Sequence, residues 1–164
     1  MTVTVRRMHD SDLVSVVAAM GQRHYFADRL ARQAAGHGVV LLALDGGNVV
    51  GDVYVWLSPA DEPELREHLP GVPLLNHLEV LPARQSRGIG TRIIAAAERT
   101  VYDLAYHRLA LGVGVDNPRA RKLYERLGYV DWGHGTVDTR YDIHRDDGRV
   151  DTFRETIAVL VKNL

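Results

Sequence analysis

The segment LEVLPARQSRGIGTRIIAAAE, residues 78–98, constrains the fold of this chain more than any other stretch. An apolar run stops at Pro82, and Gly88 and Gly90 stand where a helical pattern begins. A glycine inside a helix costs about 1 kcal/mol relative to alanine. Two glycines therefore indicate either a turn that requires positive φ angles or a ligand that approaches the backbone closely. We predict a strand, a glycine turn and a helix in that order.

The glycine turn, residues 85–91, has the features of an anion site. Backbone N–H groups at a helix start lack partners within the helix and carry the positive end of its dipole. Glycines leave room for an anion there, and Arg84, Arg87 and Arg92 add positive charge. This pattern indicates a pyrophosphate cradle, although glycines that serve turn geometry alone would give the same local sequence.

Two common nucleotide-binding motifs do not fit this turn. The dinucleotide motif GxGxxG requires a third glycine, where this chain has Ile93. A Walker loop requires lysine directly after its second glycine, where Thr91 follows Gly90. The sequence therefore disfavours a nucleotide-binding protein of another fold.

Composition narrows the class of protein. The chain has 164 residues, 46% hydrophobic and 25% charged, which predicts a single domain over residues 1–164. A net charge of −1 argues against a DNA-binding regulator or a membrane-surface protein. The absence of cysteine excludes disulfides, thiolate metal ligands and a cysteine nucleophile. The start of the chain lacks the apolar stretch of a signal peptide, so we expect a cytoplasmic protein.

Strand and helix patterns alternate along the chain, which predicts a mixed α/β sheet. Asp10 or Ser11 is expected to cap the first helix, and Asn117 and Gly128 to bound a later one. The expected strands cover 2–8, the hairpin 39–58 with its turn at Asp45–Asn48, 72–81, 108–115 and 156–162. The expected helices cover 10–20, 23–35, a short piece within 59–70, 89–104 and 117–129.

Two motifs resemble those of a known family. LEVLP followed by RQSRGIGTRII resembles the acyl-CoA-binding signature Q/R-x-x-G-x-G/A of the GNAT superfamily of N-acetyltransferases. About thirty residues later, VDNPRARKLYERLGYV resembles that superfamily's next motif, at Asn117, Ala120, Leu123, Tyr124, Gly128 and Tyr129. The resemblance covers residues 74–130. It implies a GNAT-like fold: a mostly antiparallel sheet of about six to seven strands, splayed between the two central strands, with flanking helices.

The resemblance also implies acetyl-CoA as the cofactor and places it along the chain. The turn residues expected to wrap its pyrophosphate are Ser86, Arg87, Gly88, Ile89, Gly90 and Thr91. The backbone of Leu78, Glu79 and Val80 is expected to pair with the pantetheine arm, and an amide near Val80 to polarise the thioester carbonyl. Asn117 resembles the family's cofactor-contacting asparagine, and it also fits the role of helix cap.

The resemblance assigns Tyr124 as the general acid that protonates the departing coenzyme A thiolate. The spacing of Ala120, Leu123, Tyr124 and Leu127 on one helical face equally fits packing in the core.

The general base is less defined. Some relatives carry a glutamate five residues before the asparagine, where this chain has Gly112. Glu79 is the favoured base, with Asp116, His77 and a water chain as alternatives. In an undistorted strand Asn76 and Glu79 point to opposite faces, so the placement of both depends on a bulge.

The sequence thus predicts transfer of an acetyl group from acetyl-CoA to an amine, by direct attack in a ternary complex. The acceptor, a small molecule or a protein amine, is not identified. A non-catalytic acyl-CoA-binding sensor or ligand-sequestering protein of the same fold is the alternative. Residues 131–155 carry seven acidic and four basic side chains, which suits a cationic acceptor. The histidines show no metal-ligand spacing, so no metal is expected, and the resemblance is compatible with a homodimer.

Overall fold

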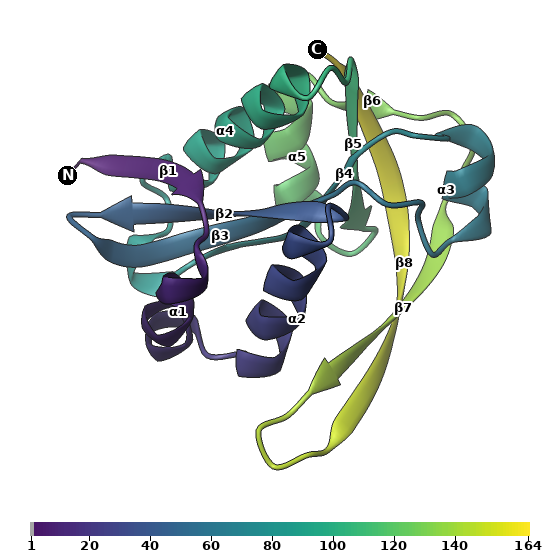
Figure 1. Ribbon diagram of the computed structural model, residues 1–164. Helices are drawn as coiled ribbons and strands as arrows, with labels where there is room; N and C mark the ends of the chain where they lie inside the picture. Colours follow the sequence, from purple (N-terminus) through teal and green to yellow (C-terminus); the bar gives the residue numbers. More distant parts are fainter. Residues whose placement is uncertain (1) are drawn as a thin grey trace.

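The fold is built on one mixed sheet of eight strands, in a computed structural model that describes residues 2–164 (Figure 1). The order along the sheet is β1-β2-β3-β4-β5-β8-β6, and β7 pairs with β8. The strands are β1 (Val3–Arg7), β2 (Gly38–Asp45), β3 (Asn48–Trp56), β4 (Leu74–Val80), β5 (Arg108–Gly114), β6 (Val130–Asp131), β7 (Val137–His144) and β8 (Val150–Asn163). The mixed, mostly antiparallel sheet is the one expected from the sequence, with more strands because β6 and β7 were not foreseen.

Helices cover both faces of the sheet (Figure 1). They are α1 (Leu13–Met20), α2 (Arg23–Ala34), α3 (Pro63–His68), α4 (Ile89–Asp103) and α5 (Pro118–Arg126). One core lies under α4 and α5, and a second core joins α1 and α2 to the opposite face of β2 and β3. Within residues 2–164, no helix combines the length and the apolar character that crossing a bilayer requires.

The two central strands separate along their length. β4 and β5 run parallel and pair only at Leu74↔Ala110 and Leu75↔Leu111. Beyond Leu111, β5 stays paired with β8 as far as Gly114, while β4 stays paired with β3 as far as Val80. The edge of β4 from Asn76 onward therefore has no β5 partner, which confirms the predicted splay between the central strands.

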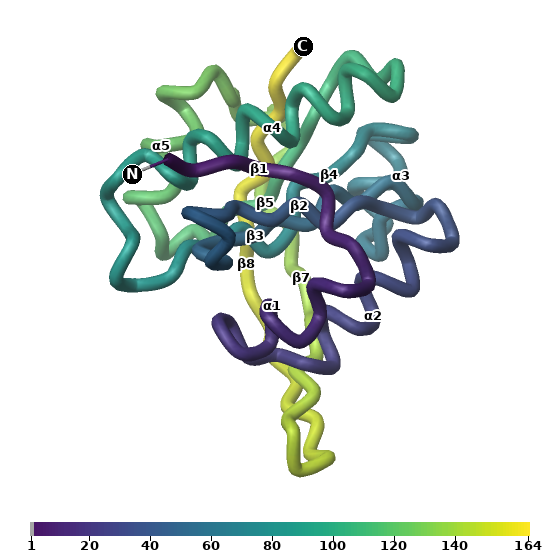
Figure 2. The backbone as a smooth tube through the Cα atoms, turned by 60° about the vertical axis from the view of Figure 1, so that its left-hand side comes forward, coloured from purple at the N-terminus to yellow at the C-terminus, as the bar shows by residue number. Residues whose placement is uncertain are grey.

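The last two strands form a ribbon that projects from the body (Figures 1 and 2). β7 and β8 pair from Val137↔Ile157 to His144↔Val150, whereas β5 reaches only Ile157 of β8. The sequence predicted a final strand over residues 156–162 only. Residues 150–156 escaped that prediction because they pair with β7 outside the core and lack a buried apolar pattern.

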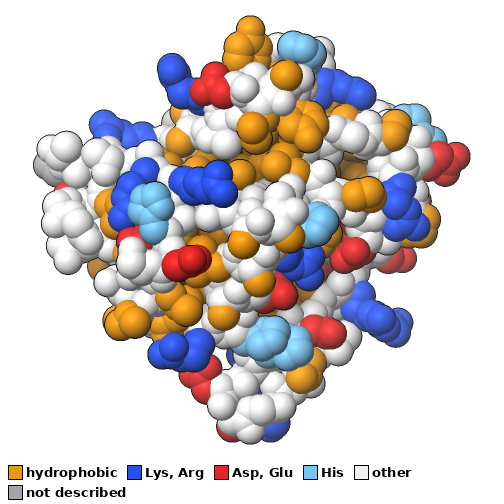
Figure 3. Space-filling model, in the orientation of Figure 1, with side chains coloured by type: hydrophobic (Ala, Val, Ile, Leu, Met, Phe, Trp, Pro, Cys, Tyr) orange, Lys and Arg blue, Asp and Glu red, His pale blue; other side chains and the backbone are white. Residues whose placement is uncertain are grey.

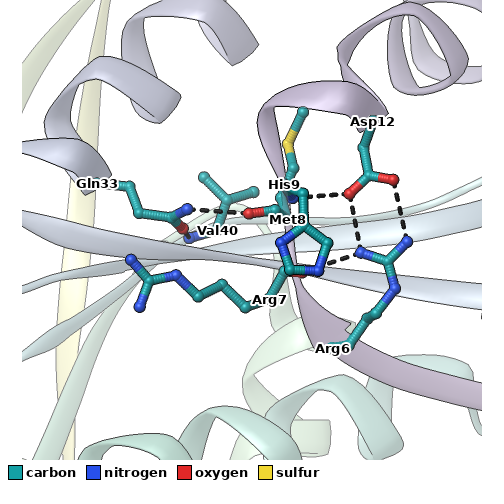
Figure 4. Close-up of polar contacts among 7 residues, drawn as sticks. All are labelled: Arg6, Arg7, Met8, His9, Asp12, Gln33 and Val40. Atoms are coloured by element: carbon teal, nitrogen blue, oxygen red, sulfur yellow. Dashed lines mark hydrogen bonds and ion pairs between the residues drawn. The ribbon is translucent and has the colours of Figure 1, made fainter.

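Polar side chains fix the junction between β1 and the first two helices (Figure 4). Asp12 accepts a hydrogen bond from the His9 N–H at 2.7 Å and pairs with Arg6 at 2.8 Å. Gln33 of α2 donates to the Met8 carbonyl at 2.9 Å and accepts from the Val40 N–H at 2.8 Å. The expected cap at Asp10 or Ser11 is wrong, because residues 10–12 form a 3₁₀ turn and Asp12 makes the capping bond.

Most other boundaries agree with the sequence predictions. The β2–β3 turn uses Gly46 and Gly47 at positive φ, and Asn117 caps α5 by accepting from the Ala120 N–H at 3.1 Å. The helix expected over 89–104 ends one residue earlier, at Asp103, and Leu104 is 49% exposed.

Candidate active site

The glycine turn opens α4 in the manner expected of an anion site. Ser86 and Gly88 both have positive φ, at 61° and 78°, so the chain reverses just before the helix begins. A Cβ atom added to Gly88 or Gly90 would meet nothing within 4 Å. Ile89 is buried in the core, so only its backbone N–H can face a ligand. These features fit a backbone cradle for phosphate oxygens.

The charges around the turn differ from those expected. Arg84 pairs with Asp45, and Arg92 donates to the Val3 carbonyl at 2.8 Å, so both guanidinium groups serve the packing of the sheet. Arg87 is exposed. Arg119, at the start of α5, reaches the Ser86 hydroxyl at 3.4 Å. The basic side chains that remain at the turn are therefore Arg87 and Arg119, and the sequence did not single out Arg119.

A bulge in β4 sets the direction of its side chains. Asn76 pairs with Tyr54 and Glu79 with Asp52, so two residues of β4 lie opposite the single residue Val53. His77, in the bulge, has a positive φ of 59°. Leu75 packs on the α4 side of the sheet, and so do Leu78 and Val80, whereas His77 contacts α2. Without the bulge, alternation would place residue 77 on the same face as Leu75.

Four polar side chains form a connected network on the α2 side of β4. His77 Nδ1 lies 3.1 Å from Asp52 Oδ2, and its Nε2 lies 2.8 Å from Gln22 Oε1. Gln22 Nε2 donates to Glu79 Oε2 at 3.1 Å, and His77 Nε2 is 3.5 Å from the same oxygen. Asp52 has no exposed surface, while the Glu79 side chain is 38% exposed. The network thus runs from a buried carboxylate to one that solvent can reach.

Burial and mutual charge shift the pKa values of the inner pair. Burial raises the pKa of Asp52 to about 6, against the hydrogen bond from His77, which lowers it. Burial lowers the pKa of His77, but the hydrogen bond to Asp52 and the charges of Asp52 and Glu79 outweigh it, and the pKa rises overall. The surroundings therefore favour a positively charged imidazole between two carboxylates.

Helix α2 closes the network from above. The Tyr25 ring stacks on His77 with a centroid separation of 4.0 Å, and Phe26 meets His77 edge-on. The Arg29 guanidinium lies 4.6 Å from the centroid of Tyr25. The Tyr25 hydroxyl is buried without a hydrogen-bond partner among the described residues. These contacts hold the imidazole in one orientation and limit its access to water.

Tyr124 lies on the other face of the sheet. It is half-buried on α5 and packs against the core under α4, with Tyr129 edge-on at 6.2 Å. Burial raises the pKa of Tyr124, which keeps the phenol protonated. Its hydroxyl has no hydrogen-bond partner among residues 2–164 of the structure. Tyr124 thus packs in the core and keeps a protonated hydroxyl, and its role as general acid stays a prediction.

Further acidic side chains lie at the end of β5. A Cβ atom added to Gly114 would overlap carboxylate oxygens of both Asp116 and Glu155, so these carboxylates lie close to the Gly114 backbone. These carboxylates share the sheet face of Glu79. Beside them, a shallow pocket is lined by residues that include Gly114 and Asn117. Figure 3 shows acidic, basic and apolar side chains interspersed over the face seen in Figure 1.

The comparison with known protein families decides the class. The model of the acetyltransferase (GNAT) family matches residues 5–129, which is well over half of the chain. This chain belongs to the GNAT family of acetyltransferases. The match includes both the glycine turn and Tyr124.

Proteins similar to this GNAT chain do not share one named acetyl acceptor. A mycothiol acetyltransferase of Pseudarthrobacter chlorophenolicus is 33% identical over 93 residues, which are 56% of this chain and 27% of that protein. The match thus spans about a quarter of the relative. The ribosomal-protein-S18-alanine N-acetyltransferase of Escherichia coli has a TM-score of 0.70 at 16% identity, covering 99% of this chain and 94% of that one. A GNAT acetyltransferase of Elizabethkingia anophelis, solved with acetyl-CoA bound, has a TM-score of 0.64 at 14% identity, covering 99% and 98%.

Three residues of this GNAT site were not singled out from the sequence. Asp52 carried a signal, because it is the only charged residue in the apolar run VVGDVYVW. Gln22 and Tyr25 carried none, because a polar turn between helices and an aromatic residue on a helix are both common. Asp52, His77 and Glu79 offer ligand atoms within 4.8 Å of one another, but the imidazole already bonds a carboxylate through one nitrogen and faces another through the second. The absence of a metal stays a prediction.

Proposed function

We propose that this chain transfers the acetyl group of acetyl-CoA to a primary amine by direct attack. The observation that carries the proposal is the gap between β4 and β5, which has the glycine turn beyond one strand and acid–base groups on both sheet faces. The chain has no cysteine, so an acetyl-cysteine intermediate is excluded. Direct attack would require the amine and acetyl-CoA to be bound together.

Acetyl-CoA binding is assigned to backbone groups. The cradle at residues 86–91 would hold the pyrophosphate, supported by its positive φ angles and by the open space at Gly88 and Gly90. Arg87 and Arg119 would add positive charge. The backbone of residues 78–80, which has no partner strand on the β5 side, would pair with the pantetheine arm. Asn117 borders the pocket at the end of β5, although its side chain is also used as a helix cap.

The chemistry divides between the two faces of the sheet. The amine nitrogen bonds to the acetyl carbon while the carbon–sulfur bond breaks. Glu79 would take one proton from the amine and Tyr124 would give one to the departing thiolate, while the second proton of a cationic amine would leave to solvent. A backbone N–H near Val80 would stabilise the negative charge on the carbonyl oxygen. The separation of the two side chains suits this order, since each acts on a different atom.

The acceptor is proposed to be a cationic amine of a small molecule or a peptide. The support is local charge: Glu79, Asp116 and Glu155 are carboxylates on one face of the sheet around the gap. An ammonium group would be attracted there and would need a base before it could attack. The ribbon of β7 and β8 and the start of α2 flank this face (Figure 1), which makes them the elements expected to select the acceptor.

A screen of amine classes tests the proposal. Purified protein is given acetyl-CoA with amino acids, polyamines, aminoglycosides, cysteinyl compounds or peptides, and free coenzyme A is followed. We expect release that depends on the amine, together with an acetylated product by mass spectrometry. Acetyl-CoA binding without turnover on any class would favour the non-catalytic sensor. No binding of acetyl-CoA would overturn the proposal.

A further inference from the structure

The Glu79 carboxylate does not stand alone, because three side chains connect it to the interior. We propose that Asp52, His77 and Gln22 are positioning residues that hold Glu79 toward the acceptor and place a positive charge beside it. This inference rests on the proposed role of Glu79 as the base. It gives a role to Asp52, a buried carboxylate, and to Gln22, which lies in the turn between α1 and α2.

Hydrogen bonds give the network a direction. With both ring nitrogens protonated, His77 donates through Nδ1 to Asp52 at 3.1 Å and through Nε2 to the Gln22 carbonyl oxygen at 2.8 Å. The Gln22 amide then donates to Glu79 at 3.1 Å. Every donor thus faces an acceptor, and the last acceptor is Glu79. A carboxylate held in this way loses rotational freedom, which would keep it oriented for the amine.

Backbone conformation supports the same assignment. Among residues 2–164, four non-glycine residues have positive φ: Gln22, His77, Ser86 and Ala105. Two of them belong to this network, and Ser86 lies in the glycine turn. Such conformations are unfavourable for residues with a Cβ and concentrate at functional sites. In β4 the strained residue is the one that the bulge turns from the α4 face toward α2.

The charges around His77 come from three elements. Asp52 on β3 and Glu79 on β4 favour the positively charged imidazole, whereas Arg29 on α2 opposes it. Tyr25 covers one side of the ring and stays uncharged, because burial raises the pKa of its phenol. Near neutral pH, Asp52 therefore acts as the counter-charge that keeps the imidazole protonated and aligned. The imidazole lies 3.5 Å from Glu79 and so places its positive charge beside that carboxylate.

Three variants separate this role from simple packing. His77→Asn and Gln22→Asn shorten the side chain, and asparagine tolerates the positive φ of both positions. Asp52→Asn removes only the buried charge. With an amine found in the screen, His77→Asn should lower kcat/KM near pH 7 by roughly 10- to 100-fold. It should also move the acidic limb of the pH–rate profile upward, because the imidazole 3.5 Å from Glu79 is gone. A merely structural role would lower the rate at every pH and leave the limb in place, which would overturn the inference.

Two controls keep the outcome decisive. In a Glu79→Gln background, adding His77→Asn should cost less than about twofold more, because the positioned group is already gone. A full additional loss would show that His77 acts on its own and would overturn the inference. If Glu79→Gln alone keeps the parent's profile, the proposed base fails, a result distinct from a failure of the network alone.

A second measurement needs no acceptor. The imidazole of His77 is titrated by NMR in the parent and in Asp52→Asn, with thermal unfolding as a check on folding. The midpoint should fall by about 1 pH unit or more when the counter-charge is removed. An unchanged midpoint in a folded variant would overturn the inference even if the enzyme is active. Acetyl-CoA affinity should stay within about twofold in all three variants.

Discussion

Tyr124 and Glu79 lie on opposite faces of the sheet. Tyr124 packs with the core under α4, whereas Glu79 accepts a hydrogen bond from Gln22 at the start of α2. The splayed strands β4 and β5 lie between these two faces. The proposed acid and the proposed base would therefore act on one bound thioester from two directions.

Tyr124→Phe tests the acid. The change removes a hydroxyl without a hydrogen-bond partner among the described residues, so the free energy of unfolding should change little. Turnover should fall by roughly 10- to 1000-fold if the phenol protonates the thiolate. Tyr129→Phe is the matched control, because its hydroxyl donates to Glu98 at 3.0 Å and its loss should cost about 1 kcal/mol of stability. If Tyr124→Phe and Tyr129→Phe turn over at the same rate, Tyr124 serves only in packing.

Gly90→Val tests the cradle more cleanly than a change at Gly88. Gly88 has positive φ, so any side chain strains the backbone there, whereas Gly90 needs no special conformation. Valine at position 90 should remove acetyl-CoA binding, measured by calorimetry, while the melting temperature falls only slightly. Ala95→Val, at an exposed position of the same helix, controls for the lower helix propensity of valine. Retained binding in Gly90→Val would mean that the turn does not hold the pyrophosphate.

The sequence was most informative where a local rule decides the structure. The glycine turn, the Asn117 cap and the Asp45–Asn48 hairpin each follow from residue types at fixed spacing. The separation of β4 from β5 came from the family resemblance alone. A bulge in this strand was considered from the sequence, but its position at His77 could not be foreseen, because it depends on how β3 pairs with β4. That one inserted residue decides which face His77 and Glu79 occupy.

The contacts around the glycine turn and around Glu79 could not be predicted from the sequence either. Arg84 and Arg92 were expected to add charge near the phosphates, but in the folded chain Arg84 pairs with Asp45 and Arg92 donates to the Val3 carbonyl. Arg119 approaches the turn only because α5 begins beside α4. Gln22 lies 57 residues before Glu79 in the chain, and no periodic pattern links such positions. Contacts of this kind follow from topology rather than from local sequence.

Asp12 should stabilise the β1–α1 junction in a pH-dependent way. The hydrogen bond from Arg6 lowers the pKa of Asp12 to about 2, against burial, with help from the His9 N–H. Asp12→Ala should lower the free energy of unfolding by about 1 kcal/mol near pH 7. Asp12→Asn should cost less, because its amide oxygen can still accept from His9. Since the folded pKa lies below the ordinary 3.8, the parent's advantage over Asp12→Asn should fade as the pH drops from about 4 toward 2. Chemical denaturation at several pH values measures this, and a constant difference would contradict it.

The Asp52–His77 pair should give the opposite trend. The folded pKa of Asp52 is raised from 3.8 to about 6, and that of His77 is raised above its ordinary 6.5. Groups with raised folded pKa values stabilise the protein at low pH, and this contribution is lost as the pH rises through those values. Relative to Asp52→Asn, the parent should therefore lose up to about 3 kcal/mol of stability between pH 4 and neutrality. Parallel stability curves for parent and variant would contradict a buried, titrating Asp52.

Glu79→Gln tests the base itself. Glutamine keeps the size of the side chain and a carbonyl oxygen for the hydrogen bond from Gln22, but it cannot take a proton near neutral pH. The variant should lose rate near pH 7 and recover as rising pH supplies unprotonated amine. Acetyl-CoA affinity should hardly change, because the contacts proposed for β4 come from its backbone.

The control for this last change is Glu155→Gln, an exposed carboxylate on the same face that lies beside Gly114. If negative charge around the gap serves only to attract the amine, both variants should raise KM in the same way and leave the shape of the pH profile intact. If Glu79 takes the proton, only its replacement should abolish the acidic limb. A Glu79→Gln enzyme with the parent's profile would pass the role to Asp116, to His77 or to an acceptor that arrives already deprotonated.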